Sequence, residues 1–139
     1  MRKFAICALG FAAAGLVAQT TRSVWDGVYT SEQSKRGQDL YAKECASCHG
    51  SDLSGGESAP PLTGAGFLSN WTGLTVGDLF ERTRVSMPQN DPGKLSRQQN
   101  ADIIAYTLSM NRFPAGKAEL DKAALALKQI RVDPEKEKK

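Results

Sequence analysis

The stretch Cys45-Ala46-Ser47-Cys48-His49 places two thiols three positions apart and an imidazole directly after the second thiol. Cys7 is the only other cysteine in the 139 residues, and His49 is the only histidine. The stretch follows a segment with helical periodicity and precedes a long segment rich in Gly, Ser and Pro. Any site that combines thiols with imidazole must therefore be built from these residues.

Several kinds of site use a cysteine pair of this spacing. A structural zinc site needs four ligands, whereas Cys45, Cys48 and His49 supply three, and adjacent Cys and His are poorly placed for one ion. A thioredoxin-like dithiol lies in a βαβ unit, and no strand pattern surrounds this motif. A simple disulfide between Cys45 and Cys48 is a further alternative. C-x-x-C-H is the attachment sequence of haem c, which is the interpretation that we favour.

Covalent haem attachment explains the spacing. Each thiol adds to one vinyl group of the porphyrin, and the adjoining imidazole then ligates the iron from the proximal face. We expect neutral His49 to bind iron through Nε2 while its other ring nitrogen donates to a carbonyl, for which Pro60 is the candidate acceptor. The motif therefore predicts one covalently bound haem c with its iron.

Residues 1–18 have the composition of a secretory signal peptide. Arg2 and Lys3 precede an apolar run from Phe4 to Ala18, which is shorter than the roughly 20 residues that span a bilayer as a helix. We predict cleavage near Ala18, export to the periplasm and no stable membrane insertion afterwards. An uncleaved membrane anchor is the alternative.

The composition excludes several classes of protein. The formal net charge is +3, and removal of Arg2 and Lys3 leaves +1, which is too small for typical nucleic-acid binding. Two cysteines remain after cleavage, too few for an exported disulfide scaffold. The single histidine excludes a haem ligated by two histidines of one chain. The length favours one domain.

Capping patterns and periodicity predict an all-α fold of three or four short helices. The predicted helices cover about 31–45, 75–84, 96–111 and a turn or two within 117–131. Thr30 is the predicted cap of the first helix, with Gln33 reaching back to it. Gly37 lies on the apolar face of that helix, which indicates that another helix crosses closely there. Thr75-Val76-Gly77-Asp78 and Ser96-Arg97-Gln98-Gln99 are predicted to begin the next two helices, the second of them with the same capping-box pattern. The buried face predicted for the helix from Ser96 consists of Ala101, Ile104, Ala105 and Leu108. No alternating pattern predicts a sheet.

Residues 50–73 are predicted to form a loop, because Pro60-Pro61 and many glycines interrupt helical periodicity. A loop of this length in a small domain indicates that it wraps a cofactor. Pro61, Leu62 and Phe67 are candidate haem contacts, with ordinary core packing as an equal alternative. Trp71 is a candidate hydrogen-bond donor to a haem propionate, again weighed equally against the core.

Two methionines, Met87 and Met110, can supply the second axial ligand after cleavage of the leader. Met110 lies at the end of a predicted helix, where packing is the default role. Met87 lies in an irregular loop, and Pro88 stiffens the backbone behind it. We therefore predict Met87 as the ligand. Thioether ligation raises the reduction potential, and two filled axial positions favour electron transfer over oxygen chemistry.

The sequence resembles the class I monohaem cytochromes c of the bacterial, periplasmic type. The resemblance spans about 34–113 and is carried by Gly37-x-x-x-Tyr41, CASCHG, APPL (59–62), Phe67, Trp71, Asp78-Leu79-Phe80, Met87-Pro88 and DIIAY (102–106). It implies thioethers at Cys45 and Cys48, His49 and Met87 on the iron, and export before haem attachment. It also implies that the N- and C-terminal helices cross at Gly37/Tyr41 and Tyr106.

The resulting domain prediction is a signal peptide (1–18), an arm and helix start (19–33), a cytochrome c domain (34–113) and a C-terminal extension with a charged tail (114–139). The predicted function is electron transfer, without enzyme activity, between periplasmic redox proteins such as a dehydrogenase and a terminal oxidase. We expect a monomer or a transient complex. The alternatives are a subunit of an exported dehydrogenase, a haem peroxidase or gas-binding protein with a labile distal ligand, and a haem-free dithiol protein.

Overall fold

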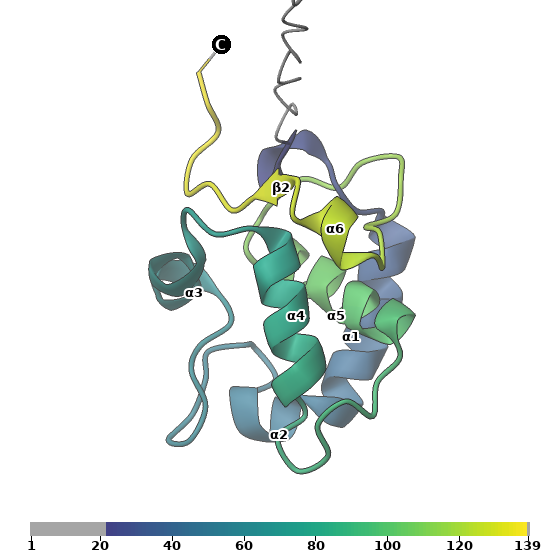
Figure 1. Ribbon diagram of the computed structural model, residues 1–139. Helices are drawn as coiled ribbons and strands as arrows, with labels where there is room; N and C mark the ends of the chain where they lie inside the picture. The colour runs from purple at the N-terminus through teal and green to yellow at the C-terminus, as the bar shows by residue number, and fades with distance from the viewer. Residues whose placement is uncertain (1–21, 139) are drawn as a thin grey trace, which may run out of the picture.

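The computed structural model describes residues 22–138 (Figure 1). The elements in chain order are β1 (Arg22–Ser23), η1 (Val24–Asp26), α1 (Ser31–Glu44), α2 (Ala46–His49), α3 (Gly64–Trp71), α4 (Val76–Ser86), α5 (Arg97–Met110), α6 (Ala124–Leu127) and β2 (Ile130–Arg131). The predicted signal peptide and its cleavage near Ala18 lie outside the described residues. Among residues 22–138, none of the helices combines the length and the apolar character needed to cross a bilayer.

The helices α1 and α5 cross each other and make the most extensive contact between two elements in residues 22–138 (Figure 1). At Gly37 the helices approach so closely that an added Cβ would lie 1.8 Å from the carbonyl oxygen of Asp102. One helical turn farther along α1, the ring of Tyr41 packs against the ring of Tyr106 with centroids 5.4 Å apart. Arg36 joins the two helices through hydrogen bonds of 3.0 and 3.1 Å to the Asp102 carboxylate. The predicted close crossing at Gly37 is confirmed.

The start of α1 differs from the prediction. Thr30 caps the helix, because its hydroxyl accepts from the backbone N–H of Gln33 at 3.1 Å. The Gln33 side chain, however, does not reach back to Thr30. It is fully buried and binds both the N–H and the carbonyl of Leu120. The local capping pattern was wrong at this residue because a distant backbone segment offers Gln33 a buried donor and acceptor.

The helices α4 and α5 have the predicted caps. Thr75 and Asp78 form a reciprocal capping box on α4, and Ser96 and Gln99 form one on α5. The four residues predicted for the buried face of α5 are all buried: Ala101, Ile104, Ala105 and Leu108. The observed helices end close to the predicted ends, at Ser86 and Met110.

Two features correct the predicted secondary structure. Residues 64–71 form α3 inside the segment predicted as loop, because Phe67, Leu68 and Trp71 follow helical spacing once the chain has passed Pro61. Within residues 22–138 the chain also forms a short parallel ladder, in which Arg22 pairs with Ile130 and Ser23 with Arg131. With two residues per strand, the ladder leaves the fold all-α, as predicted.

The buried side chains form two clusters. The larger cluster joins the N-terminal arm, α3, α4, α5 and the C-terminal extension, and contains Val24, Val28, Tyr29, Phe67, Val76, Leu79, Phe80, Ala101, Ile104, Ala105, Leu108, Phe113, Leu120, Leu127, Ile130 and Val132. The smaller cluster lies beside the C-x-x-C-H motif and contains Tyr41, Leu53, Leu95, Ile103 and Tyr106. Cys45, Ala46, Leu62 and Met110 pack against the smaller cluster. The motif therefore begins at the edge of an apolar surface.

The capping carboxylate of Asp78 makes the stability of α4 dependent on pH. Its Oδ2 accepts from the Thr75 hydroxyl at 2.7 Å and from the Thr75 N–H at 2.9 Å, and these bonds lower the pKa of Asp78 below its ordinary value of 3.8. A depressed folded-state pKa gives stability that is present above the unfolded pKa and lost as the pH falls through the folded pKa.

We expect Asp78→Asn to lower the free energy of unfolding at neutral pH by about 0.5–1 kcal/mol, with the difference vanishing in acid. Guanidinium unfolding at a series of pH values from neutral to below the unfolded pKa measures this difference. Asp39→Asn, at an exposed position of α1, is the control. A difference that stays constant with pH would contradict a role for the charge.

Candidate haem site

The C-x-x-C-H motif lies at the junction of α1 and α2. The N–H of Cys45 donates to Tyr41 at the end of α1, and the N–H of His49 donates to the Cys45 carbonyl at 3.0 Å. This helical turn places Cys45 and Cys48 three positions apart on the same side. Cys45 is half-buried, Cys48 is exposed, and both thiols are free. The two thiols are therefore arranged to bind one group beside the turn.

The thiol chemistry does not fit the other uses of a cysteine pair. Burial, and secondarily the charge of Glu44, raises the pKa of Cys45 to about 11, whereas redox-active dithiols depend on a lowered thiol pKa. Residues 22–138 contain no group of three or more His, Cys, Asp and Glu side chains that could hold a metal ion. Neither a thioredoxin-like site nor a structural zinc site is assembled in this part of the chain.

His49 is oriented for binding through one defined nitrogen. The side chain is buried, and its Nδ1 lies 2.9 Å from the carbonyl oxygen of Pro60. A carbonyl only accepts hydrogen bonds, so Nδ1 carries a proton, and in the neutral imidazole the lone pair is then on Nε2. The hydrogen bond between His49 and Pro60 that the sequence predicts is present. Two free thiols and one imidazole nitrogen fit a haem c: the thiols can attach the porphyrin, and Nε2 can ligate its iron.

The loop after His49 is folded tightly enough to bring Pro60 back to the imidazole. The N–H of Gly55 donates to the His49 carbonyl at 2.9 Å, and the N–H of Leu62 donates to Leu53 at 2.8 Å. Leu53 is fully buried and anchors the loop in the smaller cluster. Gly55 has φ +84°, and a Cβ at this position would lie 2.7 Å from the Pro61 nitrogen. The loop closes in this form only with glycine there.

The end of α5 holds the far side of the same loop. The Asn111 amide donates to the Leu62 carbonyl and accepts from the Gly64 N–H, both at 3.0 Å. The Thr63 hydroxyl donates to the Met110 carbonyl at 3.1 Å. The sequence does not reveal this role of Asn111, because an asparagine at a helix end is common and carries no specific signal.

The predicted haem contacts divide between the two apolar clusters. Leu62 packs against the smaller cluster, whereas Phe67 is fully buried in the larger one. The half-buried Trp71 ring lies 6.5 Å from the ring of Phe67. Pro61 covers Gly66, where a Cβ would lie 2.3 Å from the proline ring. Only Leu62 packs against the cluster that lies beside the motif, and the contacts of all four residues with haem stay predictions.

Met87 lies immediately after the last residue of α4. Its N–H caps the helix by donating to Thr83 at 2.9 Å, its backbone is extended, and its side chain is half-buried. Lys94, farther along the same loop, forms an ion pair of 2.5 Å with Glu44, which directly precedes the motif. The segment that carries Met87 is thus tied to the end of α1. Its position on the iron remains a prediction.

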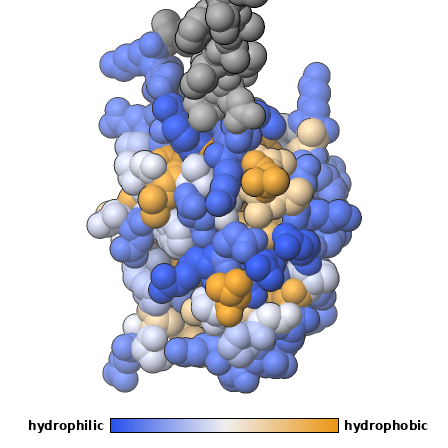
Figure 2. All heavy atoms as spheres, viewed as in Figure 1, coloured by the Kyte–Doolittle hydropathy of each residue, from blue (hydrophilic) through white to orange (hydrophobic). Residues whose placement is uncertain are grey.

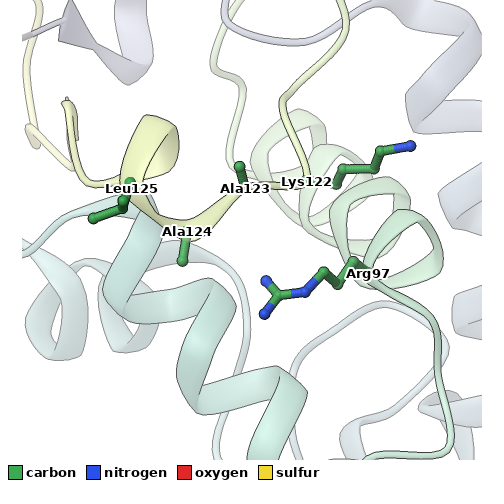
Figure 3. A pocket seen from close by; sticks show the side chains of 5 residues that line it. All are labelled: Arg97, Lys122, Ala123, Ala124 and Leu125. Carbon is green, nitrogen blue, oxygen red and sulfur yellow. The ribbon is translucent and has the colours of Figure 1, made fainter.

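A separate surface hollow lies beside α6. It is lined by Arg97, Lys122, Ala123, Ala124 and Leu125 (Figure 3). None of these residues offers a thiol, imidazole or thioether, so the hollow is not the site predicted from the sequence. The face of the molecule in Figure 2 is largely hydrophilic and carries its apolar residues in small separate groups.

Comparison with known proteins identifies the family. Residues 32–106, more than half of the chain, match the family described as cytochrome c oxidase, cbb3-type, subunit III. The chain belongs to this family of class I c-type cytochromes. Membership agrees with the spacing of Cys45 and Cys48 and with the all-α fold.

Similar proteins carry names of cytochrome subunits. The chain is 34% identical over 85 residues to the cytochrome bc1 complex cytochrome c subunit of Corynebacterium diphtheriae, a match that covers 58% of this chain and 28% of the relative. It is 30% identical over 94 residues to the cbb3-type cytochrome c oxidase subunit CcoP of Rubrivivax gelatinosus, covering 66% and 31% respectively. The chain thus spans less than a third of the length of these relatives.

A solved structure shares the fold. The sulfane dehydrogenase SoxCD from Paracoccus pantotrophus superimposes with a TM-score of 0.51 at 22% identity, over 90% of this chain and 68% of that chain. At this identity the likeness supports the fold alone. Family membership assigns this c-type cytochrome a haem c and a part in electron transfer.

Proposed function

We propose that this cytochrome carries one electron at a time on a single haem c, bound to Cys45 and Cys48 and ligated by His49 and Met87. The observation that carries the proposal is the bond from His49 Nδ1 to Pro60, which leaves Nε2 free for iron beside two free thiols. When bound, the haem supplies a ferric/ferrous couple. The chain's own residues set the environment of that couple.

The two proposed axial side chains have different tasks. His49 is fixed in its ring orientation by the Pro60 carbonyl, which also increases the basicity of Nε2. The Met87 thioether is a soft donor that favours the ferrous state and so raises the potential. With both side chains in place, oxygen, peroxide and carbon monoxide find no open coordination position. This arrangement supports electron transfer over a haem peroxidase or gas sensor.

The proposed partners are periplasmic redox proteins, a donor such as a dehydrogenase and an acceptor such as a terminal oxidase. Cys48 is exposed, so a haem bound to it through a thioether would be accessible there to an approaching partner. The predicted mature charge of +1 supports brief docking with weak salt dependence. Periplasmic location and a monomeric state are part of this proposal and depend on the predicted signal peptide.

A second candidate is a cytochrome subunit of a larger complex, such as an exported dehydrogenase. The names of the relatives favour it, because they are subunits of a bc1 complex and of a cbb3-type oxidase. Analytical ultracentrifugation of the exported protein from its own source separates the two candidates. A carrier sediments as a monomer of the mature chain, whereas a subunit sediments with its complex.

The haem assignment is tested on protein produced in a host that matures c-type cytochromes. We expect acid–acetone extraction to leave one haem on the polypeptide by mass. We also expect the ferric protein to be low-spin, with the weak red charge-transfer band of thioether–iron ligation. A colourless protein, or one with Cys45 and Cys48 bonded to each other, would refute haem binding. A high-spin ferric spectrum would favour the enzyme or gas-binding alternative.

A further inference from the structure

The C-terminal extension crosses one end of the molecule and contacts segments that are far apart in sequence. We call residues 114–133 the strap. In Figure 1 it runs from the end of α5 over the start of α1 to α6 and β2, which lie beside the upper end of α4. Neither the C-x-x-C-H motif nor its loop belongs to this segment, so the haem interpretation leaves the strap without a role.

The first half of the strap is fastened to the N-terminal arm and to α1. The N–H of Gly116 donates to the Tyr29 carbonyl at 2.6 Å. The buried amide of Gln33 donates to the Leu120 carbonyl at 3.0 Å and accepts from the Leu120 N–H at 2.6 Å. Both hydrogen-bonding groups of a strap residue are thus satisfied by one side chain of α1, which fixes the strap in position and register.

The second half of the strap is packed directly on α4. At Gly77 an added Cβ would lie 2.7 Å from the backbone nitrogen of Lys128 and 3.0 Å from the Ala124 carbonyl oxygen, so the backbones of α6 and α4 touch. Ala124 points toward α4 in the close view (Figure 3). Leu127 is fully buried in the larger cluster. The start of α4 is therefore held between the strap and the core.

The same part of the strap also holds the connection that leads into α4. The N–H of Val132 donates to the Leu74 carbonyl at 2.9 Å, and the N–H of Gly73 donates to the Val132 carbonyl at 3.1 Å. In addition, the Trp25 indole of the arm donates to the Asp133 carbonyl at 3.0 Å. Residues 73–77 are thus clamped by backbone contacts from the strap.

The clamped end of α4 is connected by a rigid helix to Met87. The helix runs without interruption from Val76 to Ser86, and Met87 closes it by donating its N–H to Thr83. A helix transmits a displacement of one end to the other, because its hydrogen bonds resist bending. A thioether is a neutral ligand at the end of a flexible side chain, so its hold on a metal depends on where its backbone is placed.

We propose that the strap is a positioning element for the axial ligand: by clamping α4 at Gly77, it keeps the Met87 thioether within reach of the haem iron. This inference rests on the proposed His49/Met87 ligation. The contacts of the strap reach Tyr29, Gln33 and residues 73–77, so the strap acts on Met87 through α4.

The experiment uses the full-length holoprotein with two variants that loosen the strap at separate places. Gly77→Ala forces α6 away from α4 while favouring the helix itself. Gln33→Leu removes both hydrogen bonds to Leu120. The matched control is Ser34→Ala, because Ser34 neighbours Gln33 but bonds Ser109 of α5 and not the strap. The readouts are the thioether–iron charge-transfer band and the rate of carbon monoxide binding to the ferrous protein.

We expect Gly77→Ala and Gln33→Leu each to weaken the charge-transfer band and to raise the rate of carbon monoxide binding by about tenfold or more, because a larger fraction of molecules has the thioether detached. Haem attachment, measured by mass, stays complete. Ser34→Ala keeps the behaviour of the parent. A purely structural strap would lower the guanidinium midpoint in both variants without moving either readout, and that result would overturn the proposal.

A measurement on the unmodified protein covers the case in which a variant fails to fold. During guanidinium titration, we expect hydrogen-exchange protection of the Leu120 and Val132 amides to disappear together with the charge-transfer band. A band that persists after these amides exchange freely would overturn the inference. If the parent shows no thioether–iron band at all, the proposed Met87 ligation itself has failed, which is a distinguishable result.

Discussion

Met87→Ala is expected to convert a six-coordinate haem into one with an open position, so that the ferrous protein binds carbon monoxide. The methyl group of alanine has no donor atom and cannot ligate iron. The reduction potential is expected to fall by on the order of 100 mV or more, because axial ligands set much of the potential of a haem. The thioether–iron charge-transfer band of the ferric form disappears in the same variant.

Met110→Ala is the matched control for this prediction. Met110 lies in the last turn of α5 and packs against the smaller cluster, so its loss creates a small cavity. We expect a loss of about 2 kcal/mol in the free energy of unfolding, with the band, the potential and the resistance to carbon monoxide retained. Redox titration and carbon monoxide difference spectra of both variants make the comparison.

The opposite result for the two methionine variants would show that Met87 is not the axial ligand. If Met110→Ala loses the band while Met87→Ala keeps it, α5 and not α4 supplies the ligand. In that event the strap has no ligand to position through α4. The two methionines therefore test the ligand assignment before the strap is examined.

The sequence predicted correctly those features that depend on interactions between residues close together along the chain. The caps at Thr75 and Ser96 depend on side chains that lie three residues from their partners. The bond from His49 to Pro60 joins residues eleven positions apart, and it was expected because a ligating imidazole needs a hydrogen bond that fixes its orientation. In each case the residues that interact are close enough in sequence for composition and spacing to reveal them.

The parts that the sequence did not predict depend on partners far along the chain. Gln33 has the sequence position of a capping residue, yet its partner Leu120 is 87 residues away. The strands β1 and β2 come from the two ends of the described chain, and each has only two residues. Strands this short show no alternation of apolar and polar residues that could be recognised in the sequence. Asn111 also bonds a loop that precedes it by 49 residues. Such contacts require the arrangement of the helices to be known first.

The helix α3 was overlooked for a different reason. Its first residues include Gly64 and Gly66, which have weak helix propensity, and it begins three positions after Pro61. Burial of Phe67 in the larger cluster compensates for that propensity, because it removes a large aromatic surface from water. Tertiary packing therefore determines the structure of this segment, and the local sequence alone does not.

The crossing of α1 and α5 gives the largest expected effect on stability. Gly37→Ala adds a Cβ that would lie 1.8 Å from the carbonyl oxygen and 2.5 Å from the carbonyl carbon of Asp102. These are backbone atoms of a buried helix, and the paired Arg36 and Asp102 side chains hold the two helices together. The helices must therefore separate. We expect a loss of about 3 kcal/mol or more, although alanine favours an isolated helix over glycine by about 1 kcal/mol.

Gly64→Ala separates this steric effect from the ordinary cost of replacing glycine. Gly64 has φ +67° and no neighbouring atom within 4 Å of an added Cβ, so only the left-handed backbone is penalised there. We expect a loss of about 1 kcal/mol. Guanidinium unfolding of the two holoproteins, followed by circular dichroism, compares them. If Gly37→Ala is no less stable than Gly64→Ala, the helices do not meet at Gly37. Because α1 leads directly into Cys45, a displaced crossing would also move the haem motif, and the haem spectrum of Gly37→Ala would change while that of Gly64→Ala would not.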